Sequence, residues 1–374
     1  MEYSDLAQAA QAIMKERGWT QAQLGEALGR TPSWASLVAS GKNDVGFSRL
    51  AKMLGRVGYE LVIRRKPDEA EVKRRAFLAS AATVALVPSA NGNPYRDPEY
   101  VQALSQRIGA NLYGSGGLTA VEEAAKHLRR VKLTAADVKD TRFLSAASSL
   151  ARHVSLVEYD ARRLPQAKEA GKLAVVFARA ADDHTGQIGA LNELSMFGAY
   201  EGDGLNSHLY ARQALTIPDV TPEEEAAAHV NFGRSLGLLN EKRNSALHLD
   251  RAREIGEGLD HFQRLNLIGN VGVALHDQAA WEPAQNAFQE AVNGLAPSSP
   301  WLAANLMARQ VQGALKASQP LLAADLMESL GRLAPLVSSA RLDTYLHEIG
   351  TLSAPWKHTP EVKTMRDQLK VLLL

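Results

Sequence analysis

The feature that most constrains this chain is a pattern that repeats through most of its length. From about Pro98 onward the sequence aligns with itself in two-helix units, about 36–44 residues apart, a period typical of helical-hairpin repeats. The units begin near residues 142, 186, 222, 261, 300 and 339. A single hairpin cannot bury its apolar stripe, whereas a stack of hairpins can. We therefore predict that residues 98–374 form an α-superhelix of stacked hairpins.

Local signals support helices throughout this region. Proline is favoured at the first position of a helix, because its missing N–H would have no partner there. Such prolines occur at four expected helix starts, in Asp97-Pro98, Thr221-Pro222, Ser299-Pro300 and Thr359-Pro360. Aromatic residues make up only 6% of the chain, while alanine and leucine recur everywhere, which favours helices over sheets.

Composition also limits the compartment and the chemistry. The 374 residues include no cysteine, which excludes disulfides and Cys-based zinc sites and fits a reducing cytoplasm. No run of 18 apolar residues occurs, so we expect no membrane-spanning helix and a cytoplasmic protein. The net charge is only +1, so any nucleic-acid binding must be local. Residues 1–75 hold more Lys and Arg than Asp and Glu, which makes them the modestly basic part.

The sequence of the N-terminal residues 1–58 predicts four short helices. Gly18 is expected to end the first, and Thr20 with Gln23 forms a predicted capping box at the start of the second. Leu24, Ala27 and Leu28 would form the buried face of that second helix.

A single strand is predicted after these helices, in residues 59–65. Leu61 and Ile63 lie on one face and Val62 on the other. A lone strand cannot satisfy its backbone groups, so we expect it to pair with its copy in a second subunit and form a homodimer. Residues 67–97 would then be a linker that contains a short apolar helix and ends in a loose segment.

The first four helices resemble the Xre family of helix-turn-helix regulators. The matching residues are Trp19 to Gly25, Gly29, Thr31 to Trp34, and Gly41-Lys42. The resemblance implies that residues 1–66 bind a double-stranded DNA operator, with one helix in the major groove. It assigns DNA contacts to Gln21, Arg30, Thr31, Ser33, Trp34, Ser36, Leu37, Lys42 and Asn43. This chain departs from the family at Ala39, where members often carry glutamate.

The repeat units resemble tetratricopeptide repeats. The clearest unit, residues 261–297, carries the small and aromatic residues of that pattern: Gly272, Leu275, Ala279, Trp281, Ala284, Phe288 and Ala291. The unit at 222–258 shows part of the same pattern, with Gly233, Leu236 and Ala246. The whole arrangement resembles bacterial regulators that join an Xre domain to a tetratricopeptide-like superhelix, some of which sense secreted peptides in quorum sensing.

Three asparagines mark a candidate effector site. Asn192, Asn231 and Asn270 follow one another at intervals of 39 residues, on the first helix of successive units. An asparagine both donates to and accepts from a peptide backbone, so this ladder suits a peptide in the concave groove. The alternative is that the asparagines make structural hydrogen bonds. Arg234 and His276 could add charge or polarity for a terminal carboxylate, although each is more often a surface residue.

Catalysis has little support in the sequence. Gly114-Ser115-Gly116-Gly117 lacks the Gly-Lys-Ser/Thr ending of a phosphate loop and predicts a flexible turn, with Thr119 near the next helix cap. Asp182-Asp183-His184 reads as a helix end and loop, and the ten histidines show no metal-binding spacing. We expect no enzymatic activity, cofactor or metal.

The leading interpretation is an all-α transcriptional regulator, a repressor or an activator. Its N-terminal helix-turn-helix domain with one short dimerisation strand would bind DNA. Its tetratricopeptide-like domain would sense a peptide, a partner protein or a small molecule, and would also mediate dimerisation. An antitoxin-like autorepressor and a protein-interaction scaffold remain as alternatives.

Overall fold

The computed structural model describes residues 14–15, 17–27 and 93–373, and the chain divides into two units, residues 1–76 and 77–374. The predicted DNA contacts from Arg30 to Asn43 lie outside the described residues, as do the strand residues Leu61, Val62 and Ile63. The apolar helix predicted in the linker lies outside them too.

The described part of the first unit contains the start of the predicted second helix. Gly18 has a φ of 64°, a left-handed conformation that glycine adopts without strain, and helix α2 (Gln21–Ala27) follows it. The Thr20 backbone N–H donates to Gln23 Oε1 at 2.8 Å, and the Gln23 N–H donates to Thr20 Oγ1 at 3.3 Å. Leu24 is fully buried. The predicted capping box and the burial of Leu24 are confirmed.

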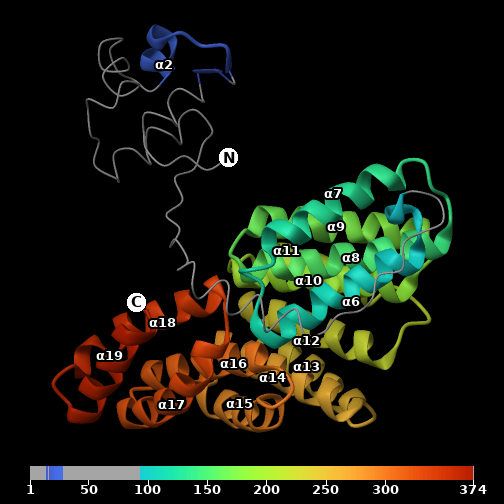
Figure 1. Ribbon diagram of the computed structural model, residues 1–374. Helices are drawn as coiled ribbons and strands as arrows, with labels where there is room; N and C mark the ends of the chain where they lie inside the picture. Colours follow the sequence, from blue (N-terminus) through green and yellow to red (C-terminus); the bar gives the residue numbers. More distant parts are fainter. Residues whose placement is uncertain (1–13, 16, 28–92, 374) are drawn as a thin grey trace. The chain divides into compact units, whose positions relative to one another are not determined.

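The second unit is helical throughout residues 93–373 (Figure 1). Its α-helices are α6 (Pro98–Ser115), α7 (Val121–Ala135), α8 (Thr141–Asp160), α9 (Leu164–Ala180), α10 (His184–Tyr200), α11 (Gly204–Ala214), α12 (Pro222–Leu238), α13 (Lys242–Gly256), α14 (His261–Asp277), α15 (Trp281–Leu295), α16 (Pro300–Lys316), α17 (Pro320–Leu333), α18 (Ala340–Leu352) and α19 (Pro360–Leu372). Short 3-10 turns are η1 (Pro94–Arg96), η2 (Ala334–Leu336) and η3 (Ala354–Trp356).

The hairpins follow the predicted repeat. Helices α8, α10, α12, α14, α16 and α18 begin at residues 141, 184, 222, 261, 300 and 340, within two residues of the starts predicted from the sequence. Each packs on the first helix of the next hairpin, which builds the stack. All four predicted proline starts are confirmed, because α6, α12, α16 and α19 each begin at a proline. The tetratricopeptide-like fold of this region is therefore confirmed.

Small residues let neighbouring helices approach, as the repeat pattern requires. A Cβ atom on Gly272 would lie 2.8 Å from the Phe288 ring, and one on Gly233 would lie 3.0 Å from the Leu249 side chain. Phe288 is 1% exposed and Leu249 is 2% exposed, so neither side chain can easily move to make room for a larger residue.

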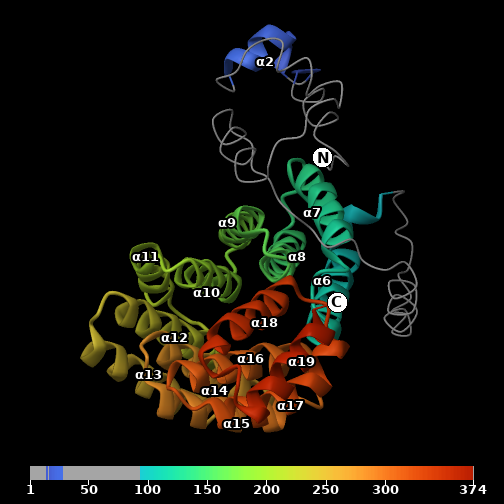
Figure 2. The same cartoon turned by 90° about the vertical axis from the view of Figure 1, so that its left-hand side faces the viewer.

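The last hairpins return to the first helices of the unit. Helix α16 packs on α6, and α18 packs on α8, which Figure 2 shows from the side. The Ser299 hydroxyl donates to the Tyr113 carbonyl at 2.8 Å. The stack is thereby closed on itself rather than left as an open arc.

The glycine-rich segment after α6 takes part in this closure. The Ser338 N–H donates to the Ser115 carbonyl at 2.7 Å, and the Leu118 N–H donates to the Ser338 carbonyl at 3.1 Å. Gly116 has a φ of 90°, and a Cβ there would lie 2.4 Å from the Ser338 carbonyl oxygen. The predicted turn is confirmed, and backbone hydrogen bonds hold it against the C-terminal hairpins. Thr119 directly precedes Ala120, the N-cap of α7, so it lies near the helix cap as predicted.

Residues 93–97, which the sequence assigns to the linker, also pack onto the helices. Tyr95 is buried, and its hydroxyl lies 2.8 Å from His127 Nδ1 and accepts from Arg130 at 2.9 Å. Among the described helices, none is both long and apolar enough to cross a lipid bilayer.

Candidate functional site

The first helices of the hairpins carry charged side chains that meet one another inside the stack. One group, here named the acidic cluster, consists of Arg152 on α8, Asn192 and Glu193 on α10, and Glu224 on α12. Arg152 Nε lies 3.0 Å from Glu193 Oε1, and Arg152 Nη2 lies 3.0 Å from Glu224 Oε1. A Cβ on Gly189 would lie 2.1 Å from Arg152 Cζ, so glycine at this position admits the guanidinium across α10.

The acidic cluster pairs one cation with two carboxylates. Burial raises the pKa of Glu193, while Arg152 and the Ser155 hydroxyl, which donates at 2.8 Å, oppose that rise. Burial by itself lowers the pKa of Arg152, but Glu224 and Glu193 hold it above its usual value. The cluster is therefore an ion-paired network with an excess of negative charge.

A second group, here named the arginine cluster, has the opposite sign. It consists of Arg234 on α12, Asp277 on α14, Arg309 on α16, and Arg341 and Tyr345 on α18. Arg234 Nη2 lies 2.7 Å from Asp277 Oδ2, and Arg309 Nη1 lies 2.8 Å from Asp277 Oδ1. Burial by itself raises the pKa of Asp277, but Arg234 and Arg309 hold it well below its usual range.

A third buried carboxylate lies where the stack closes. Asp160, at the end of α8, is fully buried and accepts hydrogen bonds from three segments. Its donors are the Gly117 N–H at 2.8 Å, Trp301 Nε1 at 2.7 Å and the Ser339 hydroxyl at 2.6 Å. Arg341 Nε lies 3.7 Å from Asp160 Oδ1, which connects this site to the arginine cluster.

The predicted asparagine ladder has three different surroundings. Asn192 is 5% exposed, and its Nδ2 donates to the Glu224 carbonyl at 3.1 Å and to Glu224 Oε2 at 3.2 Å. Asn231 is half-buried, whereas Asn270 is exposed and donates to the Asn266 carbonyl one turn back at 2.9 Å. The first member thus belongs to the acidic cluster, while the last is bonded within its own helix.

Arg234 and His276 are brought together, through Asp277 and Arg309. Each of the two is 5% exposed, so the expectation that they are surface residues is wrong. His276 Nδ1 lies 3.3 Å from Arg309 Nη1, and its ring meets the Trp281 ring edge-to-face at 5.2 Å. Tertiary packing of α14 against α15 and α16 buries this histidine.

Sequence reasoning missed Arg152, Asp160, Asp277, Arg309 and Arg341. One signal was available for Arg309, since it follows Asn270 at the same interval that separates the asparagines. The others have no fixed interval in the repeat. Their partners come from other hairpins, so no pattern along the chain identifies them.

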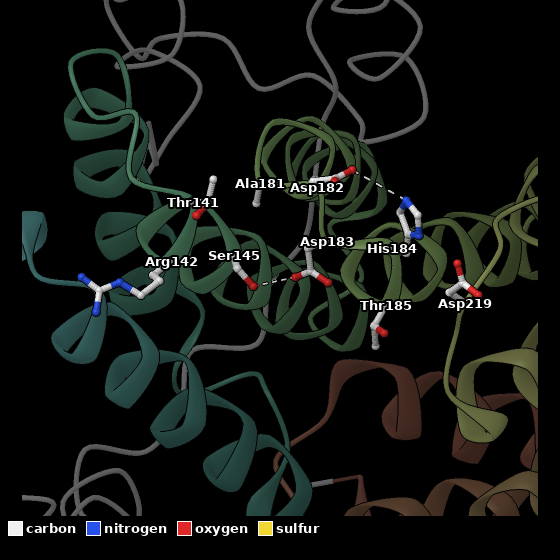
Figure 3. Close-up of a pocket in the computed structure, with 9 residues that line it drawn as sticks. All are labelled: Thr141, Arg142, Ser145, Ala181, Asp182, Asp183, His184, Thr185 and Asp219. Carbon is white, nitrogen blue, oxygen red and sulfur yellow. Dashed lines mark hydrogen bonds and ion pairs between the residues drawn. The ribbon is translucent and has the colours of Figure 1, made fainter.

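A separate surface hollow of about 430 Å³ lies at the N-terminal ends of α8 and α10 (Figure 3). Figure 3 shows Ser145 and Asp183 pointing toward each other, and the serine hydroxyl donates to Asp183 Oδ2 at 2.6 Å. Asp183 is also the N-cap of α10, accepting from the Gly186 N–H at 2.7 Å. The interpretation of Asp182-Asp183-His184 as a helix boundary is confirmed, and the Asp183 carboxylate caps the start of α10. Among the described residues, no three His, Asp or Glu side chains lie close enough to hold a metal ion.

No protein-family model and no curated protein matches this sequence. A Rap protein complexed with competence and sporulation factor is 12% identical, with 94% of this chain and 98% of that chain covered and a TM-score of 0.43. The apo form of RapI is 11% identical, with 81% of this chain and 92% of that chain covered and a TM-score of 0.34. At these identities and TM-scores, neither likeness bears on what this chain binds.

Proposed function

We propose that this chain is a dimeric DNA-binding transcriptional regulator, whose helical repeat domain responds to an effector bound among the first helices of its hairpins. Two findings support the proposal from the two ends of the chain. Helix α2 begins with a capping box, buries Leu24 and exposes Gln21, as the helix that precedes the recognition helix in a helix-turn-helix does. The repeat domain carries charged and amide side chains on the first helices of its hairpins.

The observation that carries the effector role is the state of Asn192. Its Oδ1 is buried and has no hydrogen-bond partner among residues 93–373, although its Nδ2 is fully engaged by Glu224. A buried acceptor without a donor costs about 1–3 kcal/mol. A peptide N–H placed against Asn192 Oδ1 would relieve that cost.

The DNA contacts of the proposal come from the N-terminal unit. Ser33, Trp34, Ser36 and Leu37 would face the major groove, with Arg30 and Thr31 at the start of the recognition helix. Gln21, Lys42 and Asn43 would contact the backbone. Pairing of Leu61, Val62 and Ile63 with their copies would hold two such units on two half-sites, about 34–36 Å apart or a multiple of that distance.

Regulation would follow from the geometry of the repeat domain. A bound effector changes the fraction of molecules whose two DNA-binding units match the half-site spacing. It does so only by its differential affinity for the two states.

The decisive experiment is footprinting of the purified full chain on genomic DNA, followed by titration of the recovered site. Ser33→Ala with Trp34→Ala should lower operator affinity by about 1–3 kcal/mol for each base-specific interaction that the double variant removes. Lys42→Ala should weaken binding to all DNA sequences alike. It should also reduce the salt dependence of the binding constant by about one counterion. A double variant that keeps full operator preference would contradict the recognition-helix assignment. Absence of any salt-dependent DNA binding would favour the interaction scaffold, and a co-purifying toxin-like protein would favour the antitoxin.

Dimerisation is tested separately by Val62→Pro. Proline removes a donor from the strand ladder, so monomers should appear in light scattering and operator affinity should fall. A variant that is still dimeric at low micromolar concentration would place the main interface outside residues 59–65.

A further inference from the structure

The arginine cluster gathers three guanidinium groups from three different hairpins around two tyrosines. Arg309 Cζ lies 5.3 Å from the Tyr345 ring centre, and Arg309 Nε donates to the Tyr345 hydroxyl at 3.4 Å. Arg341 precedes Tyr345 by one helical turn, and its Cζ lies 4.5 Å from the Tyr159 ring centre. Side chains from α8, α12, α16 and α18 therefore converge at one place inside the stack.

The charges in this cluster do not balance. Within residues 93–373, the ion pairs of its three arginines are made with the carboxylates of Asp277 and Asp160, so three cations face two anions in these pairs even with Asp160 ionised. Tyr159 and Tyr200 add no negative charge, because burial raises the pKa of Tyr159 and raises that of Tyr200 to about 12. Burial lowers the pKa of His276, so this histidine adds no positive charge at neutral pH. One positive charge is left over.

The excess belongs to Arg309 rather than to Arg234. Arg234 directs both Nε and Nη2 at Asp277 Oδ2, each at 2.7 Å. Arg309 reaches the same carboxylate through one nitrogen, while its other contacts are the Tyr345 hydroxyl and the His276 ring. Arg341 is also incompletely paired, since its buried Nε has no hydrogen-bond partner among residues 93–373.

A buried cation without a counterion costs several kcal/mol, and the cost disappears when an anion binds beside it. Guanidinium groups match carboxylates in shape, because two parallel N–H donors meet two oxygens. The Arg309 and Arg341 side chains remain 12% and 10% exposed, although Arg341 Nε itself is buried. A singly charged carboxylate neutralises the cluster, whereas a doubly charged phosphate would leave it negative.

We propose that the arginine cluster binds a carboxylate group of the effector, held by Arg309 and Arg341 on either side of Tyr345. The inference rests on the proposed function, in that the effector enters the interior that also contains Asn192. The effector is therefore an acid: a peptide with its terminal or a side-chain carboxylate in this cluster, or a small carboxylic acid.

The test uses the full chain and acetate as the probe, and DNA is not needed. Thermal unfolding is followed in sodium acetate and in sodium chloride at equal ionic strength. The proposal requires a rise in Tm that is specific to acetate and saturates with its concentration. An equal or larger rise in inorganic phosphate would overturn the assignment to a carboxylate, and no acetate-specific rise would overturn the site.

Variants locate the effect. Arg309→Met removes the excess cation and leaves the Arg234–Asp277 pair intact. Its Tm in chloride should therefore equal or exceed that of the wild type, and the acetate response should disappear. Arg332→Met removes an exposed arginine paired only within α17, so it should keep the full acetate response. Arg152→Met leaves two carboxylates without their cation and should lower Tm while keeping the response.

An Arg309→Met protein that still responds to acetate, or that loses as much Tm as Arg152→Met, would overturn the proposal. The result is separable from the proposed function. A carboxylate response that depends on Arg309 but leaves operator binding unchanged would retain this site and reject the regulatory role.

Discussion

Trp301 Nε1 donates a hydrogen bond to Asp160 Oδ1 at 2.7 Å, and the two residues are 141 positions apart in the sequence. The same carboxylate accepts from the Ser339 hydroxyl and the Gly117 N–H. One buried aspartate thus joins the end of α8 to the starts of α16 and α18 and to the turn after α6. This contact makes the stack of hairpins a closed structure, in which the two ends are not free to move apart independently.

Asp160→Ala should destabilise the repeat domain strongly, because it leaves three buried donors and Arg341 without their acceptor. We expect a loss of about 3–5 kcal/mol, as for a buried pair that loses one partner. Trp301→Phe removes one donor and leaves two, so its loss should be smaller, about 1–3 kcal/mol including the altered packing. Urea unfolding followed by circular dichroism measures both. Equal losses in the two variants would contradict a central role for the carboxylate.

Two glycine substitutions should act in opposite directions. Gly350→Ala, within α18, meets nothing within 4 Å and should stabilise the helix by about 0.5–1 kcal/mol, because alanine loses less backbone entropy. Gly272→Ala places a Cβ 2.8 Å from the Phe288 ring and should cost about 1–3 kcal/mol through overpacking. Urea midpoints of the two variants and the wild type provide the check. A stabilised Gly272→Ala would show that the hairpins are not packed as described.

The asparagines should differ in their contribution to stability. Asn192→Ala removes two hydrogen bonds to Glu224 from a buried site, and loss of the unpartnered Oδ1 offsets part of that cost, so stability should fall by about 1 kcal/mol. Asn270→Ala removes bonds within its own exposed helical turn and should change stability by less than about 0.5 kcal/mol. Replacing Asn192 should therefore lower Tm, whereas replacing Asn270 should leave it nearly unchanged.

The effect on effector response is measured once an effector is known. The ladder hypothesis expects each single variant to weaken the response without changing operator binding by the unliganded protein. A normal response in Asn192→Ala would remove the acidic cluster from the effector site.

The environment of His153 predicts that the folded protein loses stability at acidic pH. Burial, with a smaller contribution from Arg152, lowers its pKa to about 4, and its Nδ1 lies 2.8 Å from the Ser105 hydroxyl. In the unfolded chain the pKa of this histidine is about 6.5. Between pH 6.5 and 4 the unfolded state therefore binds a proton at His153 that the folded state does not bind. Stability is complete above about pH 6.5 and falls by about 3 kcal/mol as the pH drops to 4.

His153→Gln removes this titration and keeps a polar group near Ser105. The variant should therefore lose less stability than the wild type between pH 6.5 and 4, as measured by urea unfolding at each pH. His261→Gln, at an exposed position at the start of α14, serves as the control and should keep the wild-type dependence. Identical pH profiles for the His153 variant and the wild type would contradict the assignment.

The sequence by itself determined where the hairpins begin and how they start. Proline at a first helical position, the Thr20–Gln23 capping box and small residues opposite Phe288 are local signals, because each acts within one or two turns of the chain or at a fixed place in the repeat. The helix starts therefore agree with the sequence to within two residues.

Only the tertiary structure decided the surroundings of the candidate site. Asn192 and Asn270 are separated by two intervals of 39 residues in the sequence, yet one is buried against Glu224 of the next hairpin and the other is exposed. Arg309 shares Asp277 with Arg234 because three hairpins meet there, and Asp160 contacts Trp301 because the stack closes. Such charges are paired across long sequence separations, and electrostatic partners are chosen by distance in space. The repeat period fixes the neighbours along a helix but not the side chains that a closed stack brings face to face.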